Sequence, residues 1–174
     1  MAEDDKNTPH AHPMRDTLTQ AYERMLERVR HALETAEPTL EEAIQQAVHK
    51  AVHLGEVTRE EAHEVADYLR RDLHDMGDYL SASRRDLRTW LRMDLQLIEA
   101  RLLDLLSSVA DRTRLELAEL EARARTVGIW HTGEVAGPGE LTCTECDETL
   151  HFTRSGRIPP CPRCKATTFR RARD

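Results

Sequence analysis

The chain has 174 residues, of which 33% are charged and only 4% are aromatic, and its formal net charge is −7. No stretch approaches the roughly 18 consecutive apolar residues that a membrane-spanning helix needs, and the acidic residues 1–6 are unlike a secretory signal. We therefore expect a cytoplasmic protein without membrane association. The high charge and low aromatic content favour long, solvent-exposed helices over a compact enzyme with a deep pocket.

Two segments of different character begin the chain. Residues 1–14 carry two prolines and an acidic triplet without a periodic apolar pattern, which predicts a disordered tail. Residues 15–127 carry four successive patterns in which apolar residues recur at alternating spacings of three and four, which predicts helices with coiled-coil character. The last pattern, residues 84–127, would form a helix of roughly 65 Å if it were unbroken.

Short motifs mark where these segments begin and end. Thr-Leu-Glu-Glu at 39–42 and Thr-Arg-Glu-Glu at 58–61 are capping boxes, which predict the starts of the second and third helices. Gly55 suits the left-handed conformation that ends the second helix. Residues 128–140 contain four glycines, and we interpret them as a glycine-rich linker between two domains.

All four cysteines lie in the last segment, residues 141–174, as two C-x-x-C pairs: Cys143 with Cys146, and Cys161 with Cys164. Each pair places two sulfurs on one tight turn, and two such turns complete the closed tetrahedral shell of structural zinc. Disulfides are disfavoured in a cytosolic chain, and iron is the main rival metal. We therefore predict one structural Zn²⁺. A catalytic zinc is not expected, because sulfur would occupy every coordination position.

These patterns together predict a mainly α protein. Residues 15–127 would form an elongated antiparallel helical bundle or coiled-coil hairpin, and residues 141–174 a small C-terminal β zinc ribbon. The ribbon is too short for an adequate core of its own, so the metal would provide most of its folding free energy.

Several motifs occur together in this chain. They are Gly-Glu-Val-Thr-Arg-Glu-Glu at 55–61, Leu-Arg-Arg-Asp-Leu at 69–73, Trp-His-Thr-Gly-Glu-Val-Ala-Gly at 130–137, and the two cysteine pairs. In this combination the chain resembles the YbeL-like family of small proteobacterial zinc-ribbon proteins, which have a helical N-terminal region, a C-terminal ribbon and no assigned biochemical function. The resemblance implies that the four cysteines are metal ligands. The chain departs from the usual ribbon pattern at Lys165, where glycine is common, so this lysine must adopt the turn conformation.

Basic side chains gather in the ribbon. Residues 141–174 hold seven basic and four acidic side chains, and a zinc ion with four thiolates brings this segment close to neutrality. Arg170 and Arg171 beside Phe169 are candidates for contacting phosphate and stacking on a base. The simpler interpretation, which we favour, is a solvated last strand.

Trp130 and His131 stand out in the predicted linker, because a loop with an aromatic and a titratable side chain is a candidate contact for the ribbon or for a partner. Docking of this loop on the helices is the interpretation that we favour. His49 and His53 are spaced i, i+4, which is compatible with metal binding, but no acidic third ligand accompanies them. For this pair we expect a solvated or interhelical role.

The sequence lacks the glycine and nucleophile motifs of the common enzyme classes. Our leading hypothesis is a non-enzymatic interaction or scaffold protein without a small-molecule substrate, whose helices self-associate or bind a protein. The alternative is a nucleic-acid-associated regulator that contacts DNA or RNA through the arginines of the ribbon.

Overall fold

A computed structural model describes residues 17–36, 38–82, 100–112, 116 and 128–171. The predicted tail, residues 1–14, and most of the fourth helical pattern, residues 84–127, lie outside these ranges.

Four helices are present in the described part of the chain: α1 (Thr17–Thr35), α2 (Leu40–His53), α3 (Arg59–Ala82) and α5 (Ala100–Arg112). Both predicted capping boxes are confirmed. At the start of α2, the Thr39 hydroxyl accepts from the Glu42 N–H at 3.2 Å, and the Glu42 carboxylate accepts from the Thr39 N–H at 2.9 Å. Thr58 and Glu61 repeat this exchange before α3.

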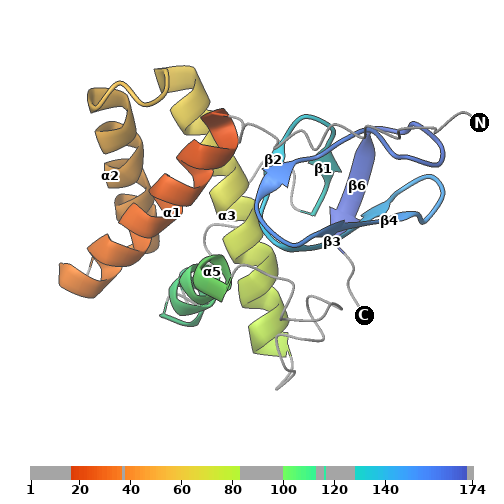
Figure 1. The fold of residues 1–174 in the computed structure, drawn as a ribbon. Coiled ribbons are helices and arrows are strands. Elements are labelled where there is room, and N and C mark those ends of the chain that lie inside the picture. The colour runs from red at the N-terminus through yellow and green to blue at the C-terminus, as the bar shows by residue number, and fades with distance from the viewer. Residues whose placement is uncertain (1–16, 37, 83–99, 113–115, 117–127, 172–174) are drawn as a thin grey trace, which may run out of the picture.

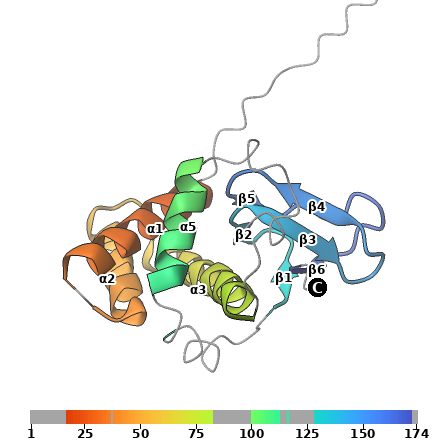
Figure 2. The same ribbon diagram turned by 90° about the horizontal axis from the view of Figure 1, so that it is seen from below.

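The helices pack around one apolar core. Helix α1 contacts the other three helices, and α3 contacts α2 and α5 (Figures 1 and 2). The predicted apolar seams supply the core, because their largest members are fully buried: Tyr22, Met25, Ile44, Leu69, Leu73 and Met76. None of the described helices combines the length and the hydropathy of a membrane span.

The C-terminal part forms two small antiparallel sheets beside α3 (Figure 1). The four-stranded sheet has the order β1-β6-β3-β4, and the two-stranded sheet pairs β2 with β5. Their bounds are β1 (Trp130–His131), β2 (Val135–Ala136), β3 (Gly139–Cys143), β4 (Thr149–Phe152), β5 (Gly156–Arg157) and β6 (Thr168–Arg171).

The segment predicted to be a linker, residues 128–140, contributes strands to both sheets. Strand β1 pairs with β6, placing Trp130 opposite Phe169, and β2 pairs with β5. Val135 of β2 even joins the helical core. The glycines indicated turns correctly, since Gly133 has a φ of +95°. Strands of two residues are too short to show an alternating pattern, and their pairing with distant residues leaves no local signal.

Candidate metal centre and its contact with the helices

Two similar turns position the four cysteines. The first follows β3, where the Asp147 N–H donates to the Cys143 carbonyl at 3.2 Å. The second precedes β6, where the Lys165 N–H donates to the Cys161 carbonyl at 2.9 Å. Asp147 and Lys165 both adopt the left-handed conformation, with φ of 57° and 65°. The expected turn conformation of Lys165 is thus present.

The four sulfurs converge on one point. All ligand atoms lie within 4.8 Å of one another. The Sγ atoms of Cys143 and Cys164 are 3.6 Å apart, as are those of Cys146 and Cys161. A tetrahedral zinc ion with Zn–S bonds of about 2.3 Å requires S···S distances of about 3.8 Å. The site therefore fits one structural Zn²⁺, and no disulfide links these cysteines.

Backbone N–H groups are directed at the sulfurs, as a thiolate shell requires. Cys146 accepts from Glu148, and Cys164 accepts from Ala166. Burial raises the pKa of the Cys161 thiol, but hydrogen bonds from the N–H groups of Cys164 and Arg163 and from the thiols of Cys164 and Cys146 outweigh it and lower this pKa to about 6. Against the lowering effect of their backbone N–H donors, burial and hydrogen bonds with the neighbouring thiols instead raise the pKa of Cys146 to about 12 and raise that of Cys164. The backbone of both turns thus favours a thiolate, whereas crowding of four sulfurs in the absence of a cation disfavours several thiolates at once.

The metal site is part of a small apolar cluster. Cys143 and Cys161 are buried with Trp130, Leu141 and Phe169. Cys146 is half-buried and Cys164 is exposed. Because this apolar cluster is small, we expect zinc binding and folding of the ribbon to be coupled.

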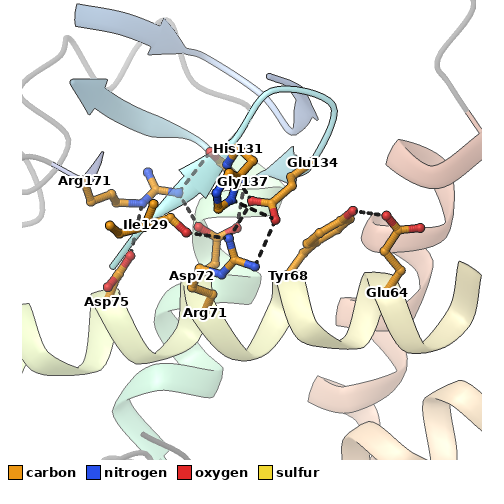
Figure 3. Close-up of polar contacts among 10 residues, drawn as sticks. All are labelled: Glu64, Tyr68, Arg71, Asp72, Asp75, Ile129, His131, Glu134, Gly137 and Arg171. Carbon is orange, nitrogen blue, oxygen red and sulfur yellow. Dashed lines mark hydrogen bonds and ion pairs between the residues drawn. The ribbon is translucent and has the colours of Figure 1, made fainter. Parts of the chain in front are cut away.

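A buried ion pair joins the ribbon to the helices (Figure 3). Arg171 of β6 donates to the carboxylate of Asp72 on α3, and their side chains are only 4% and 1% exposed. Asp72 also accepts from the Tyr22 hydroxyl of α1 and from the Gly137 N–H, both at 2.7 Å. Burial, reinforced by the charge of Asp72, raises the pKa of the Tyr22 phenol well above its usual value. One carboxylate thus connects two helices with the ribbon.

The backbone at Gly137 passes close to this carboxylate. A Cβ atom at this position would lie 3.0 Å from the Tyr22 hydroxyl, 3.2 Å from Asp72 Oδ2 and 3.3 Å from Leu106 Cδ1. Glycine is therefore needed here for the close approach of the ribbon to the helices.

A second ion pair extends the same contact. Arg71 of α3 donates to Glu134 at 2.5 Å and to the carbonyl of Ile129 at 2.9 Å. Its guanidinium also lies 4.5 Å from the centre of the Trp130 ring, and that of Arg171 lies 5.6 Å from it. Trp130 therefore packs against two arginines, one from the helices and one from the ribbon.

The five residues predicted as contacts for nucleic acid or a partner have different positions. Trp130, Phe169 and Arg171 are buried, so the structure places them in the interior rather than on a contact surface. Arg170 is exposed and pairs with Asp147 at 3.2 Å. His131 is exposed, and its Nδ1 lies 3.7 Å from a carboxylate oxygen of Glu134.

Sequence reasoning did not identify Tyr22, Asp72 and Gly137 as a connected group. A signal was nevertheless present, because two of the motifs quoted for the family resemblance, residues 69–73 and 130–137, are the segments that meet at this contact.

Comparisons with known proteins agree with this geometry. Residues 27–173 match the family model described as a zinc-ribbon containing domain. The uncharacterized protein YbeL of Escherichia coli strain K12, and its counterparts in the O6:H1 and O157:H7 strains, are 31% identical over 77 residues. This match covers 44% of the chain and 48% of each relative, so the chain spans about half the length of the curated relatives it matches. No solved structure matches. On the extent of the family match, the chain belongs to the family of proteins with this zinc-ribbon containing domain.

Proposed function

We propose that this protein is a non-enzymatic interaction scaffold, in which zinc fixes the shape of the ribbon and the docked helices and ribbon together present a surface to a protein. That protein is either a different partner or a second copy of the chain. The observation that carries the proposal is the buried Asp72–Arg171 pair, because it holds the ribbon against the helices in one orientation.

The chemistry of the site supports a structural role. Four sulfurs satisfy the tetrahedral preference of zinc, so a substrate or an activated water finds no coordination position. A hollow of about 540 Å³ lies between α1 and α5, and Leu102 and Leu105 form its apolar lining. Its rim alternates carboxylates and guanidiniums, and Arg101 pairs with Glu27 at 3.3 Å there. Such a rim is typical of a solvated groove between helices.

Burial of the predicted contact residues weighs against the nucleic-acid alternative. Base stacking requires an exposed aromatic face, but Phe169 and Trp130 are fully buried. The charge of Arg171 is neutralised by Asp72, and Arg170 pairs with Asp147.

The test uses the zinc-loaded full chain as bait in lysate of the cells that make it, at low salt, with and without nuclease. Light scattering measures self-association in parallel. We expect either a protein that is retained after nuclease treatment or a defined oligomer. Cys161→Ser, which removes a zinc ligand, should lose this binding, whereas Arg170→Met on the ribbon surface should keep it. A strict monomer that captures no protein, or capture that nuclease abolishes, would contradict the proposal.

A further inference from the structure

The exposed histidine pair of α2, His49 and His53, lies outside the function proposed above. We propose that these two imidazoles form a second metal site, which takes an exchangeable borderline divalent cation: Ni²⁺, Cu²⁺ or Zn²⁺. Helix α2, which carries the pair, lies on the side of the helical part away from both sheets (Figures 1 and 2). It is therefore separate from the four cysteines.

The helix geometry brings the two rings together. Side chains spaced i, i+4 are neighbours on one helix face. The imidazole rings of His49 and His53 are parallel within 7°, and their centroids are 6.2 Å apart. A metal ion about 2.1 Å from one nitrogen of each ring places the two centroids about 5 Å apart at tetrahedral or right-angled geometry. Because the lone pairs lie in the ring planes, the rings must also turn out of their parallel arrangement to direct one nitrogen each at a common ion, which the exposed side chains can do by rotation about their side-chain bonds.

Both imidazoles are available for a metal. They are exposed, and among the residues that the structure describes neither has a hydrogen-bond or ion-pair partner. The neighbouring Gln45 on the same stripe instead donates to Glu41 at 2.8 Å. The two histidines therefore offer free nitrogen lone pairs to solvent.

The local charge gives the site a modest affinity. His53 is the last residue of α2, and His49 lies one turn earlier, near the negative end of the helix dipole, which favours a cation. The positive charge of Lys50 in the same turn repels a cation and so weakens this effect of the helix dipole. Two neutral imidazoles are ligands that copper, nickel and zinc share, whereas Mg²⁺ and Ca²⁺ prefer oxygen. Water would fill the remaining positions, so the ion should exchange readily, unlike the ion enclosed by four sulfurs.

The experiment titrates Ni²⁺ into the zinc-loaded full chain by calorimetry, and zinc content is measured before and after. His10 and His12 are replaced by alanine in every sample, because they are a second pair of histidines close in sequence. We expect one Ni²⁺ per chain. His49→Ala and His53→Ala should each weaken binding at least about tenfold, because the second imidazole then no longer binds as an intramolecular ligand.

Two kinds of matched variant make the result specific. His63→Ala removes an exposed histidine of α3 and should leave the Ni²⁺ affinity unchanged. Gln45→His combined with His53→Ala rebuilds an i, i+4 pair one turn earlier on the same stripe and should restore binding. NMR line broadening by Ni²⁺ should be centred on α2. Absence of Ni²⁺ binding, equal binding by the His49→Ala/His53→Ala variant, or broadening centred elsewhere would overturn the proposal.

Discussion

Replacing Arg171 by methionine tests the buried contact between the ribbon and the helices. Methionine keeps most of the side-chain volume but removes the charge, so the carboxylate of Asp72 stays buried without its ionic partner. Removing one member of a buried pair costs about 3–5 kcal/mol. With a urea m-value of about 2 kcal/mol per molar, the unfolding midpoint of the zinc-loaded protein should fall by about 2 M.

The adjacent residue on the same strand provides the control. Arg170 pairs with Asp147, but these side chains are 60% and 77% exposed, so Arg170→Met should cost at most about 1 kcal/mol. Urea unfolding followed by circular dichroism measures both variants. Adding Asp72→Asn to Arg171→Met removes the stranded charge and should recover part of the loss. Equal midpoints for the two single arginine variants would refute the assignment of Arg171 as the contact that holds the ribbon.

Three further predictions concern glycine, turn conformation and zinc. Gly137→Ala should overpack the contact between the ribbon and the helices and lower the free energy of unfolding by about 1–3 kcal/mol, as measured by urea unfolding. Gly156→Ala is the control, because its Cβ would meet Phe152 at an ordinary 3.7 Å and the change should be nearly neutral. Lys165→Gly should stabilise the zinc-loaded protein by about 1 kcal/mol because it relieves a left-handed lysine; a loss of stability would argue against that turn. Elemental analysis should find one zinc per chain, and Cys161→Ser should abolish it while the far-UV helix signal persists; stoichiometric zinc in this variant would exclude the four-cysteine site.

Features with local chemistry could be predicted from the sequence. The cysteine spacing identified the metal site, because a C-x-x-C turn needs only its own backbone to present two sulfurs. The capping boxes at residues 39–42 and 58–61 were predicted for the same reason, since each closes hydrogen bonds over three residues.

Features that depend on distant pairing could not be predicted in this way. Arg71 and Asp72 resemble a solvated helix face in sequence, yet α3 is buried on two sides, by the helices and by the ribbon. Tyr68, Asp72 and Asp75 lie on a stripe beside the apolar seam, and a polar stripe gives no indication of which residues cover it. Arg171, which pairs with Asp72 and Asp75, lies in a strand of four residues that carries no periodicity of its own.

The separation of Asp72 from Arg171 has a consequence for the order of folding. The two residues are 99 positions apart, so their contact closes a very long loop, whereas the cysteine pairs and the hairpin of β3 and β4 close short ones. Short loops form early, and long ones are entropically costly until other contacts already hold the chain. Zinc capture should therefore precede docking, and refolding should show a slow phase that Arg171→Met alters while the rate of zinc uptake remains unchanged.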